Sequence, residues 1–80
     1  MDDTLQRMQR TFRAVLDNDT LELLPSMTAA DVEGWDSLSH IDLIVALERE
    51  FKIKFTTAEI SKLKNVGELE ALVAGKRRYS

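Results

Sequence analysis

Residues 34–43 read Gly34-Trp35-Asp36-Ser37-Leu38-Ser39-His40-Ile41-Asp42-Leu43. In this stretch a polar loop marked by a glycine turns into a long helix rich in apolar residues, with Asp36 as the expected N-cap. The hydroxyl of Ser37 is therefore predicted at the start of a helix, beside free backbone amide donors. A phosphate ester there would be stabilised by the positive end of the helix dipole, by about 0.3–1 kcal/mol where exposed.

The composition predicts one small globular domain over residues 1–80. The chain is 44% hydrophobic and 31% charged, with three glycines and one proline. It has no cysteine, which excludes disulfides and thiolate metal sites and suits the reducing cytoplasm, where we expect the protein to act. No apolar run is long enough for a membrane span, and no signal-peptide pattern follows Met1. The carboxylates do not have the spacing of a calcium-binding loop, so we expect no metal site.

Charge is distributed unevenly along the chain, whose net charge is −3. From Glu22 to Glu50 there are seven acidic residues and one basic residue, whereas from Phe51 onward there are seven basic and three acidic residues. Because Ser37 lies in the acidic half, a basic partner would be steered toward it. The sequence pI of about 5.0 and the lack of a nucleic-acid reading motif argue against nucleic-acid binding.

Hydrophobic spacing predicts an all-α fold with three main helices and one short helix. The first helix is expected from Asp3 to Leu16, capped by Asp2 or Asp3 and ended by residues 17–19. The second is expected from Ser37 to Phe51. Its apolar residues are too many for one stripe, which predicts that part of this helix surface is exposed and contacts a partner.

Two capping motifs predict the remaining helices. Thr56 and Glu59 form a capping box that opens a short helix ending near Leu63. Asn65 is expected to open a last helix that Gly75 ends. Residues 52–55 should form an extended connector, and residues 76–80 a frayed basic tail.

The long connection between the first two helices, residues 20–36, is unusual for so small a domain. We expect a short helical turn at residues 28–31. We also expect the apolar side chains of this connection to pack on the core: Leu21, Leu23, Leu24, Met27 and Val32.

This order of elements, a small four-helix bundle with a long loop between helices one and two, resembles the fold of acyl carrier proteins. Gly34, Asp36, Ser37 and Leu38 are similar to the family's Gly-x-Asp-Ser-Leu motif, whose serine carries a 4'-phosphopantetheine arm. The acidic and aromatic end of the second helix, residues 48–51, also resembles the family.

The resemblance implies that a phosphopantetheinyl transferase moves the arm from coenzyme A onto Ser37, with Asp36 and Leu38 flanking the attachment point. The thiol of the arm would hold an acyl or aminoacyl group as a thioester, received from a loading enzyme and delivered to downstream transferases or synthases. Leu38 would anchor the helix start against the bundle. The partner-binding face implied by the family consists of Ile41, Asp42, Val45 and Glu48.

Departures from the family pattern indicate a specialised pathway. Fatty-acid-synthesis carriers are strongly acidic along helices two and three, where this chain has Arg49, Lys62 and Lys64. Trp35 before the Asp-Ser pair resembles carriers of specialised biosynthetic pathways. We therefore expect a stand-alone, monomeric carrier for polyketide, modified-lipid or aminoacyl assembly, with cargo selectivity in the loading enzyme.

Ser37 has two alternative interpretations, as the nucleophile of a hydrolase and as a surface residue of an adaptor. A hydrolase needs a base, an orienting acid and an oxyanion hole. His40 follows Ser37 by three residues, but the Gly-x-Ser-x-Gly elbow is absent, so no catalytic residue is expected and His40 should be an exposed helix residue.

Trp35 is expected to cover a small core. A non-carrier helical adaptor that binds partners through the second helix stays open as an alternative, because only modification of Ser37 separates it from a carrier.

Overall fold

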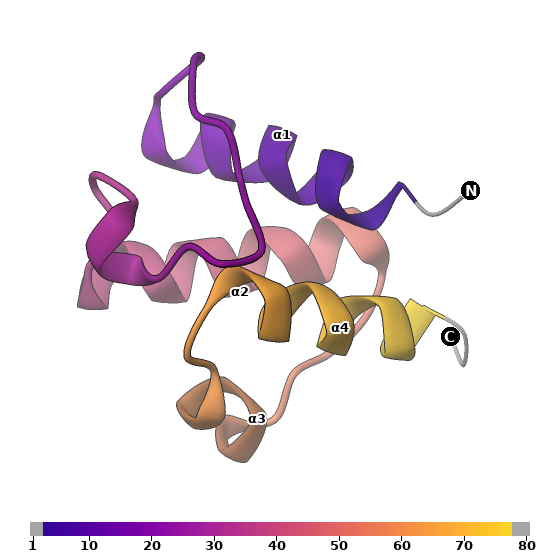
Figure 1. The fold of residues 1–80 in the computed structure, drawn as a ribbon. Coiled ribbons are helices and arrows are strands. Elements are labelled where there is room, and N and C mark those ends of the chain that lie inside the picture. Colours follow the sequence, from indigo (N-terminus) through magenta and orange to yellow (C-terminus); the bar gives the residue numbers. More distant parts are fainter. Residues whose placement is uncertain (1–2, 78–80) are drawn as a thin grey trace.

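The protein is all-helical (Figure 1) in a computed structural model that describes residues 3–77. A short 3₁₀ turn lies in the long loop between the first two helices, as expected from the sequence. In chain order the elements are α1 (Thr4–Leu16), η1 (Ala29–Asp31), α2 (Ser37–Phe51), α3 (Thr57–Lys62) and α4 (Val66–Arg77). α1 packs against both α2 and α4, and the short α3 lies at the edge of the bundle.

The starts of α3 and α4 confirm the predicted capping motifs. At α3 the backbone N–H of Glu59 donates to Thr56 Oγ1 at 3.2 Å, and the N–H of Thr56 donates to Glu59 Oε1 at 2.8 Å. At α4 the backbone N–H of Glu68 donates to Asn65 Oδ1 at 2.8 Å. Each side chain satisfies a helix amide that has no partner within its own helix, so these starts follow from local sequence.

The first two helices end at left-handed residues that are not glycine. Asp17 (φ 51°) ends α1 and Lys52 (φ 57°) ends α2. The end of α1 at the predicted 17–19 segment is thus confirmed. Its predicted start differs in detail, because Asp3 precedes α1 without a side-chain cap bond, and Asp2 lies outside the described residues.

The prediction that Gly75 ends the last helix was wrong, because α4 continues to Arg77. Arg77 Nη1 donates to Asp3 Oδ1 and to Thr4 Oγ1, each at 2.9 Å, and so joins the end of α4 to the start of α1. These contacts between distant parts of the chain oppose the cost of a glycine within a helix, which is about 1 kcal/mol. Residues 76–77, expected as a frayed tail, are therefore helical, and residues 78–80 lie outside the described part of the chain.

A second arginine strengthens this junction of α1, α2 and α4. Arg7 Nε donates to Glu50 Oε2 at 2.8 Å, and Arg7 Nη2 donates to the Glu50 carbonyl at 2.8 Å. The guanidinium carbons of Arg7 and Arg77 lie 4.7 and 5.1 Å from the centroid of the Phe51 ring. Both cations therefore contact one aromatic ring near the end of α2.

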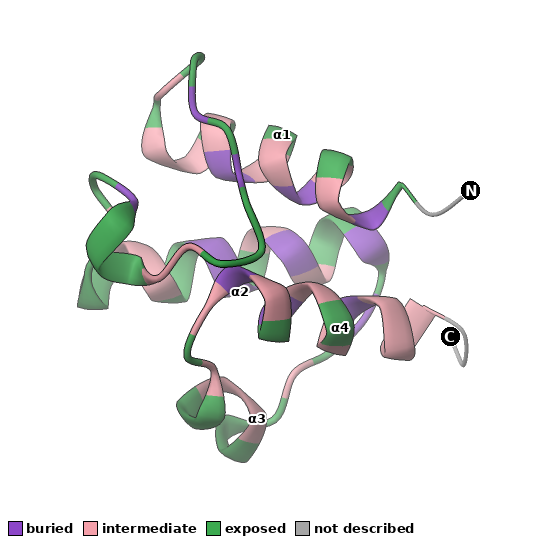
Figure 2. Ribbon diagram, viewed as in Figure 1, coloured by how far each residue is buried: buried purple, intermediate pink, exposed green. Residues whose placement is uncertain are grey.

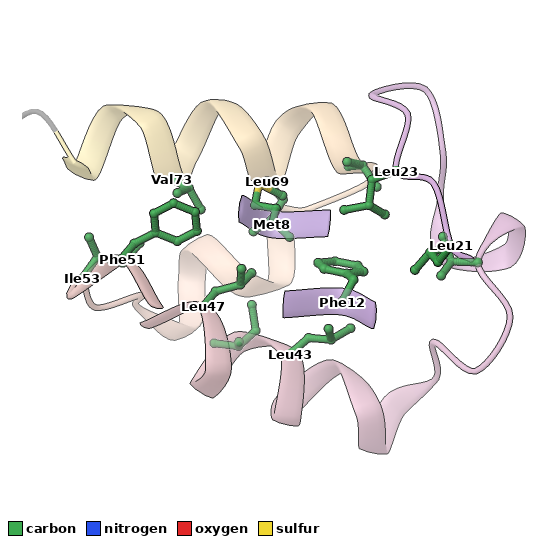
Figure 3. Close-up of a cluster of buried hydrophobic side chains, with 13 residues drawn as sticks. Met8, Phe12, Leu21, Leu23, Leu43, Leu47, Phe51, Ile53, Leu69 and Val73 are labelled. Atoms are coloured by element: carbon green, nitrogen blue, oxygen red, sulfur yellow. The ribbon is translucent and has the colours of Figure 1, made fainter. Parts of the chain in front are cut away.

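The hydrophobic core lies between α1, α2 and α4, with exposed residues on the outer surface of the bundle (Figure 2). Met8 and Phe12 of α1 are fully buried, and the side chains labelled in Figure 3 converge on them from the other helices and from the loop. The buried residues of α2 and α4 are Leu43, Ile44, Leu47, Phe51, Val66, Leu69 and Val73.

The long loop closes one side of this core. Leu21, Leu23 and Val32 are buried and Met27 is partly buried, as predicted, whereas Leu24 is 53% exposed. The expectation for Leu24 was wrong because neighbouring residues of an extended segment point in opposite directions, and Leu23 takes the core side.

Side chains of α1 hold this loop in place. Arg13 Nε donates to the Leu21 carbonyl at 2.7 Å, and the N–H of Leu23 donates to Gln9 Oε1 at 2.8 Å. Further along, the N–H groups of Val66 and Gly67 donate to the carbonyls of Met27 and Pro25, both at 2.8 Å. The loop is thereby fixed between α1 and the start of α4, which sets the approach of the chain to α2.

Candidate functional site

Ser37 is the first residue of α2 and is exposed. The turn before it is fixed by a reciprocal capping box. Asp36 Oδ1 accepts the backbone N–H groups of Leu38 and Ser39 at 3.0 and 2.9 Å. In return, Ser39 Oγ accepts the Asp36 N–H at 2.7 Å and donates to the Gly34 carbonyl at 2.7 Å. The predicted N-cap is confirmed, but the part played by Ser39 was missed, although its position three residues after Asp36 fits a capping box.

Gly34 allows this turn because its backbone is left-handed, with φ 87°, a conformation that residues with a Cβ adopt at a cost. The turn brings the backbone back on itself, and the Trp35 N–H donates to the carbonyl of the buried Val32 at 3.2 Å. The glycine that marks the loop in the sequence is thus required by the backbone path into α2.

The electrostatics at Ser37 differ from the sequence expectation in one respect. The hydrogen bond from the Ser39 backbone, with further ones from Leu38 and the Ser39 side chain, holds the pKa of Asp36 below its ordinary value. An ionised carboxylate therefore stands beside Ser37. Because it occupies the amides of Leu38 and Ser39, those donors are not free for a phosphate group, and the helix dipole of α2 is what favours an anion there.

Trp35 covers part of the core, as predicted. Its ring meets the Phe12 ring edge-on, with centroids 5.2 Å apart and an interplanar angle of 88°. Its Nε1–H donates to His40 Nδ1 at 3.0 Å, and the two rings are nearly parallel, at 18°, with centroids 6.0 Å apart. His40 is only partly exposed, so the expectation of an exposed helix residue was wrong, because one turn of α2 brings its ring beside the indole of Trp35.

A pocket of about 490 Å³ adjoins Ser37. Residues from the start of α2, from the loop before it and from the junction of α3 and α4 line it. They include Trp35, Ser37, His40, Leu63, Lys64 and Leu69. Its walls are therefore mostly apolar and aromatic, with a lysine and the ionised Asp36 at the side of the serine.

The apolar residues of α2 that do not face the core form an exposed stripe. Leu38, Ile41 and Val45 are 83%, 57% and 41% exposed, and Asp42 beside them is also exposed. The expectation that Leu38 anchors the helix start was wrong. Leu38 precedes Ile41 by three residues and Val45 by seven, so it shares their outer face. The prediction of an exposed apolar surface on this helix is confirmed.

Glu48 lies further along α2, away from Ser37. Its Oε2 accepts the backbone N–H of Phe55 at 2.9 Å, which holds the connector between α2 and α3. Its carboxylate therefore has an internal partner, unlike the exposed Asp42. Of the four residues expected on one partner-binding face, Ile41, Asp42 and Val45 are thus exposed, whereas Glu48 is partly buried and bonded to the connector.

Comparison with known proteins assigns the family. A family model described as "Phosphopantetheine attachment site" matches residues 6–73 of the chain. The chain belongs to this carrier family. The carrier is also similar to a holo acyl carrier protein from Geobacter metallireducens, solved in solution by NMR. The two are 46% identical with a TM-score of 0.91, over 98% of this chain and 90% of that one.

The family establishes what the chain does. It is a phosphopantetheine-bearing acyl carrier protein, and it is not an enzyme. The expected fold of four helices is confirmed by the likeness to the holo carrier. The geometry at α2 fits the cofactor, because the carrier has an exposed serine hydroxyl at a helix N-terminus and an apolar pocket beside it. Within residues 3–77, none of the helices has the length and apolar character that crossing a membrane requires.

Proposed function

We propose that the carrier bears its phosphopantetheine arm on Ser37. The observation that supports this most directly is the difference between Ser37 and Ser39. The hydroxyl of Ser39 is engaged with the Asp36 N–H and the Gly34 carbonyl, whereas Ser37 is exposed at the first position of α2. Attachment at Ser39 would break the capping box, whereas attachment at Ser37 leaves it intact.

The residues around Ser37 have distinct parts in this proposal. Asp36 fixes the start of α2 and so presents the serine in one orientation to the transferase. Leu38, exposed beside it, offers an apolar contact to the transferase or to the arm rather than an anchor to the core. When bound, the arm supplies a terminal thiol that holds an acyl or aminoacyl group as a thioester.

The stripe of Leu38, Ile41 and Val45, with Asp42, is the proposed docking face for partner enzymes. These partners are the phosphopantetheinyl transferase, the loading enzyme and the downstream transferases or synthases. An exposed apolar stripe with one carboxylate gives a small contact guided by charge, which dissociates quickly enough for the carrier to move between enzymes. Glu48 would contribute only at the edge of this face, because its carboxylate also holds Phe55.

We also propose that the carrier serves a dedicated cytoplasmic pathway, with polyketide, modified-lipid or aminoacyl cargo. Support comes from the basic residues Lys62 and Lys64 near α3 and from Trp35 beside the serine. Partners of this carrier would have to accept a positive charge next to the pocket, where Lys64 lies.

Intact-protein mass spectrometry tests the attachment site. The native chain is incubated with coenzyme A and a broad-specificity phosphopantetheinyl transferase, alongside Ser37→Ala and Ser39→Ala. We expect one phosphopantetheine on the native chain and none on Ser37→Ala. Ser39→Ala should still be modified, if more slowly, because only the cap is weakened. If Ser37→Ala is still modified, the attachment site is another residue. If the native chain is folded but is not modified, the helical adaptor is favoured instead.

The docking face has its own test. Asp42→Lys and Ile41→Ala should each slow loading of the arm and transfer from it, while leaving the thermal unfolding of these surface variants close to that of the native chain. Unchanged rates in both variants would exclude this face from docking.

A further inference from the structure

A second hollow lies at the opposite end of α2 from Ser37. It has a volume of about 730 Å³ and lies between the end of α2, the connector that follows it and the end of α4. We call it the lysine groove, defined by Lys52, Ile53, Lys54, Leu72, Gly75 and Lys76. Since α2 has 15 residues, the lysine groove is about 20 Å from Ser37.

The rim of the lysine groove is positively charged. Lys52 and Lys54 are exposed, and no ion pair joins either of them to another residue in the described range 3–77. Lys76 Nζ pairs with Glu59 Oε1 at 2.9 Å and lies 5.8 Å from the centroid of the Phe55 ring. Glu48, the acidic residue of the lining, has its carboxylate on the Phe55 N–H. Two cations of this groove therefore have no ion-pair partner among residues 3–77.

The floor of the lysine groove is apolar and open. Ile53 and Leu72 contribute aliphatic side chains. Gly75 lies within α4, where a glycine weakens the helix, yet a Cβ added there would meet, beyond its own helical backbone, no atom of residues 3–77 within 4 Å. Neither a turn nor a close backbone approach therefore requires glycine at this position. Its effect on the molecular surface is to leave space in the groove.

We propose that the lysine groove is a second docking surface, which binds an acidic amphipathic segment of a partner protein. Apolar side chains of the segment would enter beside Gly75 and Leu72, and its carboxylates would pair with Lys52 and Lys54. This preference is opposite to that of the acidic half of the chain around Ser37, which attracts basic partners. Because the two surfaces lie at opposite ends of α2, a partner held in the groove leaves Ser37 accessible to a second enzyme.

NMR titration of the ¹⁵N-labelled carrier tests the proposal. The probe is a synthetic amphipathic helical peptide built from glutamate and leucine, and its control replaces each glutamate with lysine. We expect shifts of the amide signals at residues 52–54 and 72–76 with the acidic peptide only. Binding should weaken as salt is raised, because the Debye length falls from about 10 Å at 0.1 M to about 3 Å at 1 M.

Matched variants locate the binding. Lys52→Glu combined with Lys54→Glu should weaken binding by about tenfold, since two exposed ion pairs are each exchanged for a repulsion. Gly75→Leu should also remove binding, by filling the groove without changing its charge. The control, Arg10→Glu combined with Lys62→Glu, makes the same change in net charge at exposed residues outside the groove and should bind as the native chain does. Unchanged Trp35 signals show that each variant is folded.

Three outcomes would overturn the proposal. One is equal binding of the acidic and basic peptides, and another is equal weakening by the Lys52/Lys54 double variant and by the control double variant. The third is binding to vesicles of phosphatidylcholine and phosphatidylglycerol but not to the acidic peptide, which would make the groove a contact for anionic lipid. None of these results bears on modification of Ser37, so failure here is distinguishable from failure of the proposed attachment site.

Discussion

The indole N–H of Trp35 donates to Nδ1 of His40 across 3.0 Å, and both rings line the pocket beside Ser37. The chain has no other tryptophan and no other histidine, so each partner of this bond can be followed without interference. Nδ1 can accept a hydrogen bond only while that nitrogen carries no proton. The bond therefore couples the ring of His40 to the position of the aromatic wall next to the serine.

The first prediction concerns this coupling. His40→Phe keeps a ring beside Trp35 but has no acceptor for the indole N–H, so the NMR signal of the Trp35 Nε1 proton should shift upfield as the proton loses its hydrogen bond. An unchanged indole signal in this variant would mean that the bond does not form in solution.

The second prediction concerns the cap of α2. Since the pKa of Asp36 is lowered in the folded chain, its contribution to stability is full above the ordinary value of 3.8 and is lost as the pH falls through the lowered pKa. Asp36→Asn keeps an oxygen acceptor but has no charge to lose. The thermal unfolding temperature of the native chain should therefore fall more steeply below pH 3.8 than that of Asp36→Asn.

The native chain has to be compared with Asp36→Asn because other carboxylates also lose their charge, and their contribution to stability, in the same pH range. The pKa of Asp3 is lowered mainly by the hydrogen bond from Arg77, and that of Glu59 mainly by its bond from the Thr56 backbone. Both also stabilise the fold less in acid. Parallel pH profiles of the native chain and Asp36→Asn would show that the cap makes no charge-dependent contribution.

Helix starts were predictable from the sequence because their causes are local. Asp36, Thr56 and Asn65 each satisfy amides no more than three residues away, and the sequence displays those spacings directly. The end of α4 was not predictable in this way. It depends on contacts between Arg77 and residues 3–4, which lie more than seventy positions earlier in the chain.

The same distinction applies to the functional site. The motif around Ser37 identified the serine and its cap, since both are encoded within five residues. The exposure of Leu38 and the bond from Trp35 to His40 depend on which face of α2 the core occupies. That face is set by Met8 and Phe12 of α1, and a family motif carries no information on it.

The third prediction concerns the junction of α1, α2 and α4. Arg77→Gln removes the cation from Phe51 and the charged bonds to Asp3 and Thr4, and should cost about 0.5–1 kcal/mol through the lost cation–π contact alone. Amide hydrogen exchange should quicken most in the last turn of α4. Arg10→Gln, on the exposed side of α1, is the control. If both variants change exchange equally, Arg77 does not hold the helix end.

The last prediction compares two glycines of α4. Gly75→Ala adds a Cβ that meets no side chain of residues 3–77 and should stabilise the carrier by about 0.5–1 kcal/mol, because alanine favours the helix over glycine. Gly67→Ala brings a Cβ to 3.0 Å from the Pro25 carbonyl oxygen, which already accepts the Gly67 N–H at 2.8 Å. The loop would have to shift there, so the helix gain should be reduced or reversed. Urea unfolding of both variants gives the two free energies. Equal stabilisation would mean that the Pro25 carbonyl can move away from residue 67 without a loss of folding free energy. The loop would then not fix the start of α4.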